Sequence, residues 1–574
     1  MKLSKTGRTG GGELLALLVL GCLMFNLPLC AAKTLHVVPP GTAGVTPTSP
    51  YASWETAATS LVDAIAASTE KSGDPPGDTI LVAPGTYNID TMIDANKRRL
   101  TIRSMNRTTG KEDPENTILD GGGTSSILKL SRTFILVSGL TFANGCKELS
   151  AFANNQGNAA VWISNHYGSV SNCIFRGNNT VNTSGGCIVA TAWSPLVSGC
   201  IFTNNTSEVM SSDTLGGGVI RMATDADTPG RIENCLFSDN HSRAKKICGG
   251  VIYATYAALD NCQFSENTFT NAETESSAKV ASYGGYVFLG NAGGMDGRCS
   301  MTNCRFTGRA IDTEDDDTIL GTMVRINCPE CIVSNCTFDA IEENVGDLVQ
   351  GMVNVGAHSA KFAECKFTGG KHVRSTNING GSSLVMIGGG ITNVTFRNCL
   401  FSDNVMQGRY YAIKHGQTKL PTTGFTVENC TFANNTVGQT ISGETTSTCT
   451  NYIVNSVFTS TLYLSAPGVV SNCCLASHSV NAKISYGDFL PSEVGGDLKF
   501  VNAVNGDYHL RRKSPLREKG MLLDWMTADA TDLDGKSRVV SFYGIPYSRD
   551  PSALPDIGCY EQQDMPPGFI IELR

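Results

Sequence analysis

Apolar and polar residues alternate in a short word, Asn-Cys-x-Phe, that recurs along most of the chain. Because Cys and Phe stand two positions apart, an extended strand places both side chains on the same face. Complete copies begin at Asn172, Asn234, Asn261, Asn303, Asn335, Asn398 and Asn429, and variants occupy 199–202, 364–367 and 455–458. In several copies a further Asn follows the Phe by three positions, at 178, 205, 240, 267, 404 and 435. Most copies are about thirty residues apart, which predicts one such strand in each unit of a structural repeat.

A second word, a glycine pair followed by apolar residues, lies between copies of the first. It is found at 185–188, 217–220, 249–252 and 284–287, with looser versions at 321–324 and 351–353. Each unit then holds two or three short strands separated by Gly and Asn turns, without room for a helix. The stretch between Phe-x-x-Asn and the glycine pair varies most in length, the longest being 269–282. We expect these stretches to be variable loops gathered on one side of the molecule.

A single unit cannot bury its apolar face, but coiled units can, because each strand then pairs in parallel with its counterpart about 4.8 Å away. We therefore predict an all-β chain: a single-stranded right-handed parallel β-helix (a solenoid) with an N-terminal cap and a small C-terminal domain. Burying each inward Phe contributes about 1.5–3 kcal/mol. Asn at the turns tolerates the left-handed backbone and can form ladders of side-chain amides.

The domain boundaries follow from where the repeat begins and ends. Residues 1–32 are expected to be a signal peptide, 33–490 the β-helix and 491–574 a separate C-terminal region. Short strand patterns at 77–82, 100–103 and 116–121 suit the first coils. Helical spacing of apolar residues from Trp54 to Ser68 predicts a cap over the open N-terminal end, because an exposed sheet end would template aggregation.

The N-terminus has the order of a secretory signal, with Lys2, Lys5 and Arg8 before an apolar run at 14–25 and small residues at 30–32. An uncleaved anchor and a lipoprotein cleavage site at 19–22 are the alternatives. The protein is therefore expected to be secreted or on the cell surface, as an exported bacterial protein. A net charge of -8 argues against nucleic acid as a partner, and we expect a monomer attached to a membrane only through an anchor.

Twenty-one cysteines in an exported chain would ordinarily indicate disulfides. Here nine of them occupy one slot of the repeat: Cys173, Cys200, Cys235, Cys262, Cys304, Cys336, Cys365, Cys399 and Cys430. Side chains stacked in register point in parallel, which suits disulfide geometry poorly, so we predict an inward ladder of reduced thiols. Cys187 and Cys248 are expected in a second ladder. For Cys328 and Cys331, a loop disulfide or buried thiols are favoured over zinc, because no second pair accompanies them.

With these repeats, the chain resembles the pectate-lyase-like superfamily of right-handed β-helices from about residue 33 to 490. The glycine-pair and Phe-x-x-Asn words also resemble the repeat of chlamydial polymorphic outer-membrane proteins, which are surface adhesins, although the autotransporter barrel of that family is not recognisable here. The segments 506–510, 514–515, 532–538 and 556–561 resemble the choice-of-anchor domain of bacterial surface proteins, with Cys559 where that family has Ala. The last resemblance implies attachment to a surface by an unspecified route.

Many β-helices cleave uronic-acid polysaccharides, but fold alone does not establish an activity. A glycosidase needs two carboxylates about 5–9.5 Å apart, and Asp225 and Asp227 are the nearest candidates, although Pro229 beside them favours a plain turn. A lyase needs a base near the α-carbon of the uronate, for which Arg221, Arg231 and Arg325 are candidates that neither spacing nor neighbours single out.

An acidic run supplies the candidates for calcium, the only cofactor considered: Asp312, Glu314, Asp315, Asp316 and Asp317. A solvated loop is the alternative and the favoured interpretation. The preferred function is that of a secreted or cell-surface protein for adhesion or glycan binding, without catalysis, whose partner is a polysaccharide or other surface ligand. A polysaccharide lyase or glycoside hydrolase acting on acidic polysaccharide is the alternative. Basic or acidic residues clustered on adjacent coils would favour the enzyme, and an exposed aromatic strip would favour binding alone.

Overall fold

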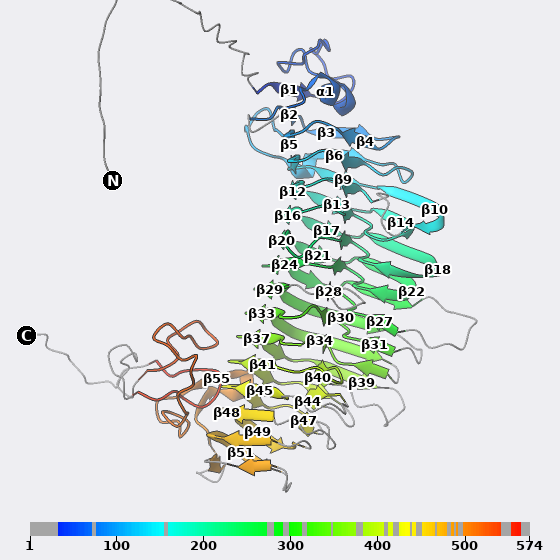
Figure 1. Cartoon of the computed structure of the whole chain (residues 1–574). Helices are drawn as coiled ribbons and strands as arrows, with labels where there is room; N and C mark the ends of the chain where they lie inside the picture. Colours follow the sequence, from blue (N-terminus) through cyan, green and yellow to red (C-terminus); the bar gives the residue numbers. More distant parts are fainter. Residues whose placement is uncertain are drawn as a thin grey trace, which may run out of the picture.

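The computed structural model is a long solenoid of parallel strands with a helix at its N-terminal end and an irregular region beside its last coils (Figure 1). The structure describes residues 32–71, 76–153, 159–271, 281–290, 298–312, 318–345, 348–356, 358–374, 383–406, 411–416, 424–436, 439–442, 451–464, 468–478, 484–486, 489–491, 497–540 and 553–563. The predicted signal segment lies outside these residues except for its last position. Among the described residues, no helix is long and apolar enough to cross a membrane.

Sheet A is the longest continuous ladder of parallel strands, and each of its strands pairs with the corresponding strand of the next coil. It consists of β1 (Thr34–Val37), β2 (Thr79–Val82), β5 (Thr101–Ser104), β8 (Leu136–Ser138), β12 (Ser169–Ser171), β16 (Leu196–Ser198), β20 (Gly230–Glu233), β24 (Ala257–Asp260), β29 (Ser300–Thr302), β33 (Ile332–Ser334), β37 (Lys361–Ala363), β41 (Val394–Arg397), β45 (Phe425–Glu428), β48 (Asn451–Val454), β50 (Gly468–Ser471) and β52 (Ile484–Tyr486).

Sheet B follows sheet A within each coil and contains the strands of the Asn-Cys-x-Phe word. Its strands are β3 (Gly85–Asn88), β6 (Thr117–Asp120), β9 (Thr141–Ala143), β13 (Ile174–Arg176), β17 (Ile201–Thr203), β21 (Leu236–Ser238), β25 (Gln263–Ser265), β30 (Arg305–Asp312), β34 (Thr337–Val345), β38 (Lys366–Thr368), β39 (Lys371–Arg374), β42 (Leu400–Ser402), β43 (Val405–Met406), β46 (Thr431–Ala433), β49 (Val457–Leu462), β51 (Cys473–His478) and β53 (Phe489–Pro491).

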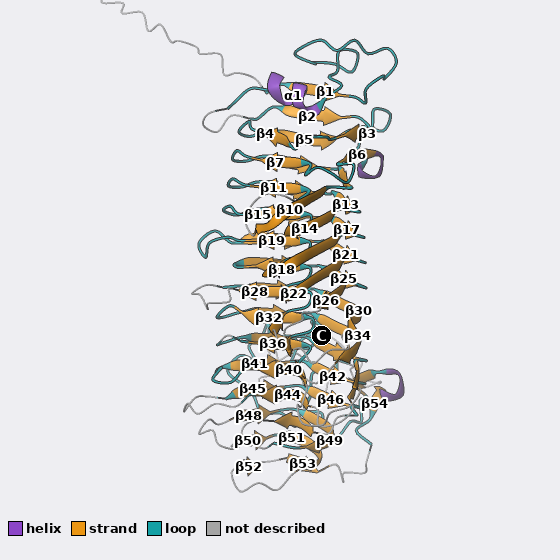
Figure 2. Cartoon of the chain, turned by 90° about the vertical axis from the view of Figure 1, so that its right-hand side faces the viewer, coloured by secondary structure: helices purple, strands orange, loops and turns teal. Residues whose placement is uncertain are grey.

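Sheet C contains the strands that follow the glycine pair and leads back to sheet A. Its strands are β4 (Ile93–Ala95), β7 (Leu128–Leu130), β11 (Val161–Ile163), β15 (Ile188–Ala190), β19 (Ile220–Met222), β23 (Ile252–Ala254), β28 (Val287–Gly290), β32 (Val324–Asn327), β36 (Val353–Val355), β40 (Ser383–Ile387), β44 (Tyr411–His415) and β47 (Gln439–Ser442). The strands of these sheets lie one above the next along the axis (Figure 2).

The predicted parallel β-helix is therefore confirmed, and its interior is built from the residues that the repeat places inward. Phe175, Phe202 and Phe237 belong to a buried stack in which neighbouring ring centroids lie 4.7 and 4.8 Å apart. Behind it, the amide of Asn205 donates to Asn240 Oδ1 at 2.8 Å and to the Phe175 carbonyl oxygen at 3.0 Å. Such a ladder leaves few buried polar groups unpaired, so the turn after each Phe can stay inside the core.

The two asparagines of the repeat perform different tasks. The Asn that opens Asn-Cys-x-Phe takes the left-handed backbone, with φ near 56° at Asn234 and 50° at Asn261, which Asn tolerates better than most residues. The Asn three positions after Phe forms the buried amide ladder instead. The cysteines of the Cys slot are free thiols that lie inside the coil, and burial raises the pKa of thiols such as Cys365. Cys328 and Cys331 are likewise buried thiols.

The stretches expected to be variable loops form strands in the middle coils, which corrects that expectation. They make up sheet D: β10 (Cys146–Ala153), β14 (Asn179–Thr183), β18 (Thr206–Gly216), β22 (His241–Cys248), β26 (Thr268–Asn271), β27 (Ala281–Tyr283), β31 (Thr318–Leu320) and β35 (Leu348–Gln350). Sheet D projects to one side of the solenoid (Figure 1). The glycine pair joins it to sheet C, and a Cβ on Gly218 would collide with the carbonyl oxygen of Gly250.

The N-terminal cap is shorter than its sequence pattern suggests. Helix α1 (Leu61–Ala67) begins after Ser60, whose side chain accepts a hydrogen bond from the Val62 N–H at 3.1 Å. Residues 54–60 are not helical: Ala58 forms a parallel bridge with Val37, and Trp54 packs edge-on against His36 with ring centroids 4.5 Å apart. The helix buries Leu61, Ala64 and Ile65 against the first coils.

The C-terminal region packs on the outer face of sheet B at the last coils, where that face is apolar. It contains a short hairpin of β54 (Phe500–Asn502) and β55 (Asp507–Leu510), whose strands are joined by the 3-10 turn η2 (Ala503–Asn505). Another 3-10 turn, η1 (Pro114–Asn116), precedes β6 near the other end of the solenoid. Leu400 and Ala433 of sheet B are buried in a cluster with Tyr508 and Leu533. Side-chain amides of the solenoid turns also bind it, since Asn398 donates to the Thr531 carbonyl oxygen at 2.8 Å.

Candidate functional site

One row of outward side chains on sheet C brings cations and aromatic rings together from successive coils. In strand β19, Ile220 and Met222 point into the core, so Arg221 between them points outward. The strand register aligns Arg221 with the middle residues of the neighbouring strands. From the N-terminal end, this outer row consists of Asp94, Lys129, Trp162, Val189, Arg221, Tyr253, Phe288, Arg325, Asn354, Met386 and Lys414.

Neighbours in the outer row are in direct contact. The Lys129 ammonium lies 4.3 Å from the centre of the Trp162 ring, and the Arg221 guanidinium lies 4.8 Å from that of Tyr253. Tyr253 in turn stacks on Phe288, with centroids 5.2 Å apart. These distances are those of cation–π and stacking contacts, which hold the side chains in fixed orientations.

The second half of the row is polar. The Arg325 guanidinium donates a hydrogen bond to Asn354 Oδ1, and Lys414 lies 5.7 Å from the centre of the Tyr411 ring. Arg325 and Lys414 are half-buried, whereas Asn354 is buried. Arg325 and Lys414 therefore keep part of their surface in contact with solvent.

Burial sets the electrostatics at the centre of the row. Arg221 is 8% exposed, and desolvation lowers the pKa of its guanidinium. Desolvation also raises the pKa of the Tyr253 phenol, although the adjacent Arg221 opposes this shift. From Lys129 to Lys414, the row contains four cations and no carboxylate.

The structure brings together only part of the set of catalytic candidates proposed from sequence. Arg221 and Arg325 lie in the same row, separated by β23 and β28. Arg231 lies on sheet A, half exposed, and pairs with Glu233 at 3.1 Å. Asp225 and Asp227 lie in an exposed turn after β19, as the plain-turn interpretation predicted.

The calcium candidates cannot be placed as a group. Asp312 is the last residue of β30, and Glu314, Asp315, Asp316 and Asp317 lie outside the described residues. Within the part of the chain that the structure describes, no group of three or more His, Cys, Asp or Glu side chains could hold a metal ion. Calcium binding by this acidic run stays a prediction.

The sequence analysis did not single out Lys129, Trp162, Tyr253, Phe288 or Lys414. A signal for part of this set was available, because the third position after the glycine pair is Arg221 in one unit, Tyr253 in the next and Phe288 in the one after. Within its own strand, each of these three residues is a single polar or aromatic residue between two apolar ones, which is common in strands and indicates no site. Only the register shows that they form a continuous row.

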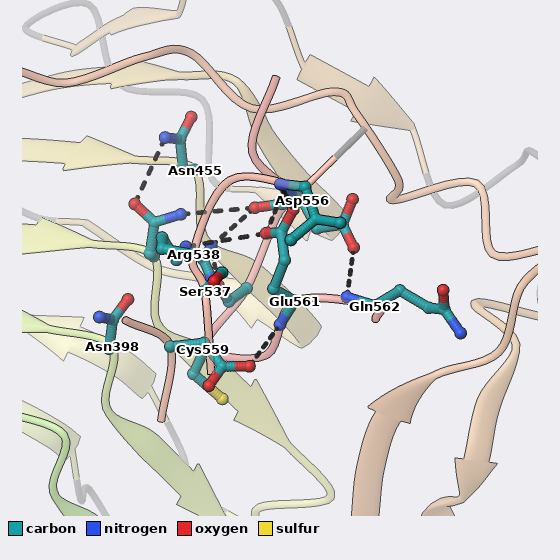
Figure 3. Close-up of polar contacts among 12 residues, drawn as sticks. Asn398, Asn455, Ser537, Arg538, Asp556, Cys559, Glu561 and Gln562 are labelled. Carbon is teal, nitrogen blue, oxygen red and sulfur yellow. Dashed lines mark hydrogen bonds and ion pairs between the residues drawn. The ribbon is translucent and has the colours of Figure 1, made fainter. Parts of the chain in front are cut away.

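A second polar cluster, in the C-terminal region, is structural. Arg538 and Glu561 are completely buried and lie 4.0 Å apart. Arg538 also donates to the carbonyl oxygens of Asp556 and Gly558 at 2.8 and 2.6 Å (Figure 3). The carboxylate of Asp556 accepts hydrogen bonds from backbone N–H groups at 518 and 562. The buried members of these motifs, Asp532, Arg538, Asp556 and Glu561, therefore hold this region together.

This cluster predicts a pH dependence of stability. Burial raises the pKa of Asp556 to about 6, and the pKa of Glu561 is also raised. A carboxyl whose pKa is higher in the folded state binds more protons there, so its stabilising contribution is lost as the pH rises from about 4 to 6. The difference from the usual Asp pKa of 3.8 corresponds to about 3 kcal/mol. We expect the Asp556→Asn variant to lack this part of the pH slope in urea unfolding between about pH 4 and 7. A slope equal to that of the unmodified protein would contradict the assignment.

Comparisons with known proteins concern the fold class alone. No family model matches the chain, and no curated protein matches it. The solved structures that resemble it include alginate lyase AlyF-OU02 in complex with G6, at 12% identity and a TM-score of 0.34, covering 81% of this chain and 87% of that one. A mannuronic acid-specific polysaccharide family 6 lyase from human gut microbiota matches at 10% identity and a TM-score of 0.30, covering 72% of this chain and 86% of that one. The receptor-binding domain of the Siphovirus 9NA tailspike matches at 10% identity and a TM-score of 0.24, covering 78% of this chain and 79% of that one. These scores are too low to carry an argument about the chain, whose parallel β-helix is shown by its own strand pairing.

Proposed function

We propose that this protein is an exported, cell-surface or secreted glycan-binding protein that binds an acidic polysaccharide along the outer row of sheet C without cleaving it. The observation that carries the proposal is the alignment of Lys129, Arg221, Arg325 and Lys414 with Trp162 and Tyr253 on one face. Cations neutralise the carboxylates or sulfates of such a chain, and the rings contact the C–H faces of its sugars. A linear ligand would contact the half-buried members of the row, namely Lys129, Trp162, Tyr253, Arg325 and Lys414, whereas Val189, Phe288 and Asn354 between them are buried.

The arrangement favours binding over catalysis. A glycosidase needs a pair of carboxylates, and the described part of the row has none between Lys129 and Lys414. At neutral pH the Tyr253 phenol remains protonated, because burial raises its pKa, so it is a poor base. The adhesin-like and anchor-like resemblances of the repeat and of the C-terminal region agree with a surface role and stay predictions.

A polysaccharide lyase is the second candidate, and one observation favours it. Burial lowers the pKa of Arg221, which moves its guanidinium toward the role of proton acceptor that a lyase requires. The partly exposed Tyr253 phenol beside it could donate the proton to the leaving oxygen. This alternative predicts unsaturated uronate as the product, with or without added calcium.

Retention on polysaccharides tests the proposal. We expect the protein to bind alginate, polygalacturonate or heparin with an affinity that falls as salt is added. The double variant Lys129→Gln/Arg325→Gln should bind about tenfold more weakly, which is a loss of about 1.4 kcal/mol. The matched control is Arg305→Gln, since Arg305 lies on sheet B and pairs with Asp339 at 2.7 Å. Circular dichroism would verify that each variant is folded.

The outcomes separate the two candidates. Salt-sensitive binding that the double variant weakens and the control does not, without release of unsaturated uronate, supports glycan binding at this row. Release of unsaturated uronate that Arg221→Gln abolishes would replace the proposal with the lyase. Equal binding by the unmodified protein and the double variant would remove the row from the function.

A further inference from the structure

Aromatic side chains are exposed at one corner of the solenoid, where each N-terminal coil passes from sheet C to sheet A. Phe134, Tyr167 and Trp193 come from successive coils and are 37%, 44% and 46% exposed. Phe134 stacks on Tyr167 with centroids 4.8 Å apart, and His166 stacks on Trp193 at 4.1 Å. We call these residues, His166 included, the aromatic corner. Exposed rings grouped in this way indicate contact with a ligand.

The backbone at this corner takes the left-handed conformation, which costs more for a bulky residue than for Gly or Asn. Phe134 and Tyr167 have φ of 62° and 58°, in the left-handed region that bulky residues rarely occupy. The corner between sheets A and B uses Asn for the same conformation, as at Asn234. Other coils place Arg99, Glu330, Ser359 and Asn393 at positions equivalent to Phe134, also with positive φ. The left-handed conformation therefore belongs to the corner itself, and what distinguishes these two coils is that exposed aromatic rings occupy it.

The orientation of Trp193 is set before any ligand arrives. Its backbone N–H donates to His166 Nδ1 at 3.1 Å, and its carbonyl oxygen accepts from the Tyr167 N–H at 2.9 Å. The imidazole covers one face of the indole at an interplanar angle of 20°. A ring held in this way loses little conformational entropy on binding.

The next coil at this register supplies carboxylates in place of another ring. The Ser194 N–H donates to the Thr228 carbonyl oxygen at 3.1 Å, as the Tyr167 N–H does to Trp193. Thr228 is therefore the counterpart of Trp193 in the next coil, and the exposed turn that contains Asp225 and Asp227 lies just before it in the sequence. An aromatic face that ends beside hydrogen-bond acceptors matches a sugar ring, which has C–H groups on its faces and hydroxyl donors at its edge. The two negative charges disfavour an anionic sugar at this position.

We propose that the aromatic corner binds a neutral hexose ring, stacked on Trp193 with its hydroxyls directed toward Asp225 and Asp227. This site goes beyond the acidic-glycan row, because it uses other residues and a different sugar chemistry. A protein partner is the less suitable occupant, since stable protein interfaces bury about 800 Å² per partner. Three partly exposed rings flanked by charged groups do not provide that area.

The experiment uses the purified full chain and three neutral probes: cellohexaose, mannohexaose and chitohexaose. Calorimetry should detect saturable binding to at least one of them, and that sugar should protect tryptophan fluorescence from acrylamide. Trp193→Ala should weaken the affinity about tenfold or more, whereas Trp193→Phe should retain most of it. Tyr452→Ala is the matched control, because Tyr452 is 48% exposed on sheet A, outside the corner.

Salt and the row variants distinguish this site from the acidic-glycan row. Binding of the neutral probe should persist in about 0.5 M NaCl, where the Debye length is roughly 4 Å, and in Lys129→Gln/Arg325→Gln. No saturable binding to any probe, or an equal loss in Tyr452→Ala, would overturn the inference. It would also be overturned if Trp193→Ala abolished self-association in sedimentation and left sugar binding intact, because the corner would then be a protein interface.

Discussion

Replacing Phe237 with Ala is expected to lower the free energy of unfolding by about 3–5 kcal/mol. Phe237 is fully buried between Phe202 and Phe264, whose ring centroids lie 4.8 and 4.9 Å from its own. The neighbouring coils are held by their own strand pairing and cannot collapse into the space that the ring leaves, so a cavity remains. Urea unfolding monitored by circular dichroism measures the loss.

Two further variants make this test specific. Phe237→Leu should cost less than about 1.5 kcal/mol, because most of the volume is kept. Tyr452→Ala, on an exposed outer position, should change the stability by less than about 0.5 kcal/mol. If Phe237→Ala were no more harmful than Tyr452→Ala, the Phe stack would not be the principal support of the coils.

Replacing Arg538 with Met should destabilise the C-terminal region by about 3–5 kcal/mol. Arg538 is the cation that faces the buried carboxyl of Glu561, and it also donates to two backbone carbonyl oxygens. Without it, a buried acid and two acceptors lose their partner, which costs more than the pair itself contributes. Hydrogen exchange of residues 497–540 and 553–563 measures the change locally.

The double variant Arg538→Met/Glu561→Gln distinguishes charge from packing. It removes the uncompensated acid, so it should recover part of the lost protection. Arg511→Met is the control, because Arg511 is exposed in the same region and its guanidinium donates to the Val501 carbonyl oxygen and not to the buried cluster. Unchanged exchange in Arg538→Met would show that the cluster does not hold the region together.

The spacing of residues was sufficient to predict the β-helix and most of its interior. Cys and Phe two positions apart share a face, so the inward stacks of Phe and of free Cys follow from the repeat. The buried amide ladder was also predictable, although the sequence pattern did not separate Asn205, which forms the ladder, from Asn234, which takes the left-handed turn. These features depend on neighbours along the chain and on a repeat length visible in it.

Other features were decided by contacts between residues far apart in the sequence. The Trp54–Ser68 pattern predicted a longer helix than α1. The observed helix is shorter because Ser60 caps its N-terminus and Trp54 packs on His36 instead of joining the helix. The stretches expected to be loops became sheet D, since each segment has a partner one coil away. The motifs of the C-terminal region proved to form a buried polar cluster packed on sheet B.

The sequence by itself determined the coil, because a repeated inward pattern has only one way to bury its apolar side. It did not determine the candidate binding row, because Arg221, Tyr253 and Arg325 are more than thirty residues apart and each looks ordinary in its own strand. Only the parallel register places them on one line. That register is a property of strand pairing between coils, and so the arrangement of outward side chains becomes visible only in the tertiary structure.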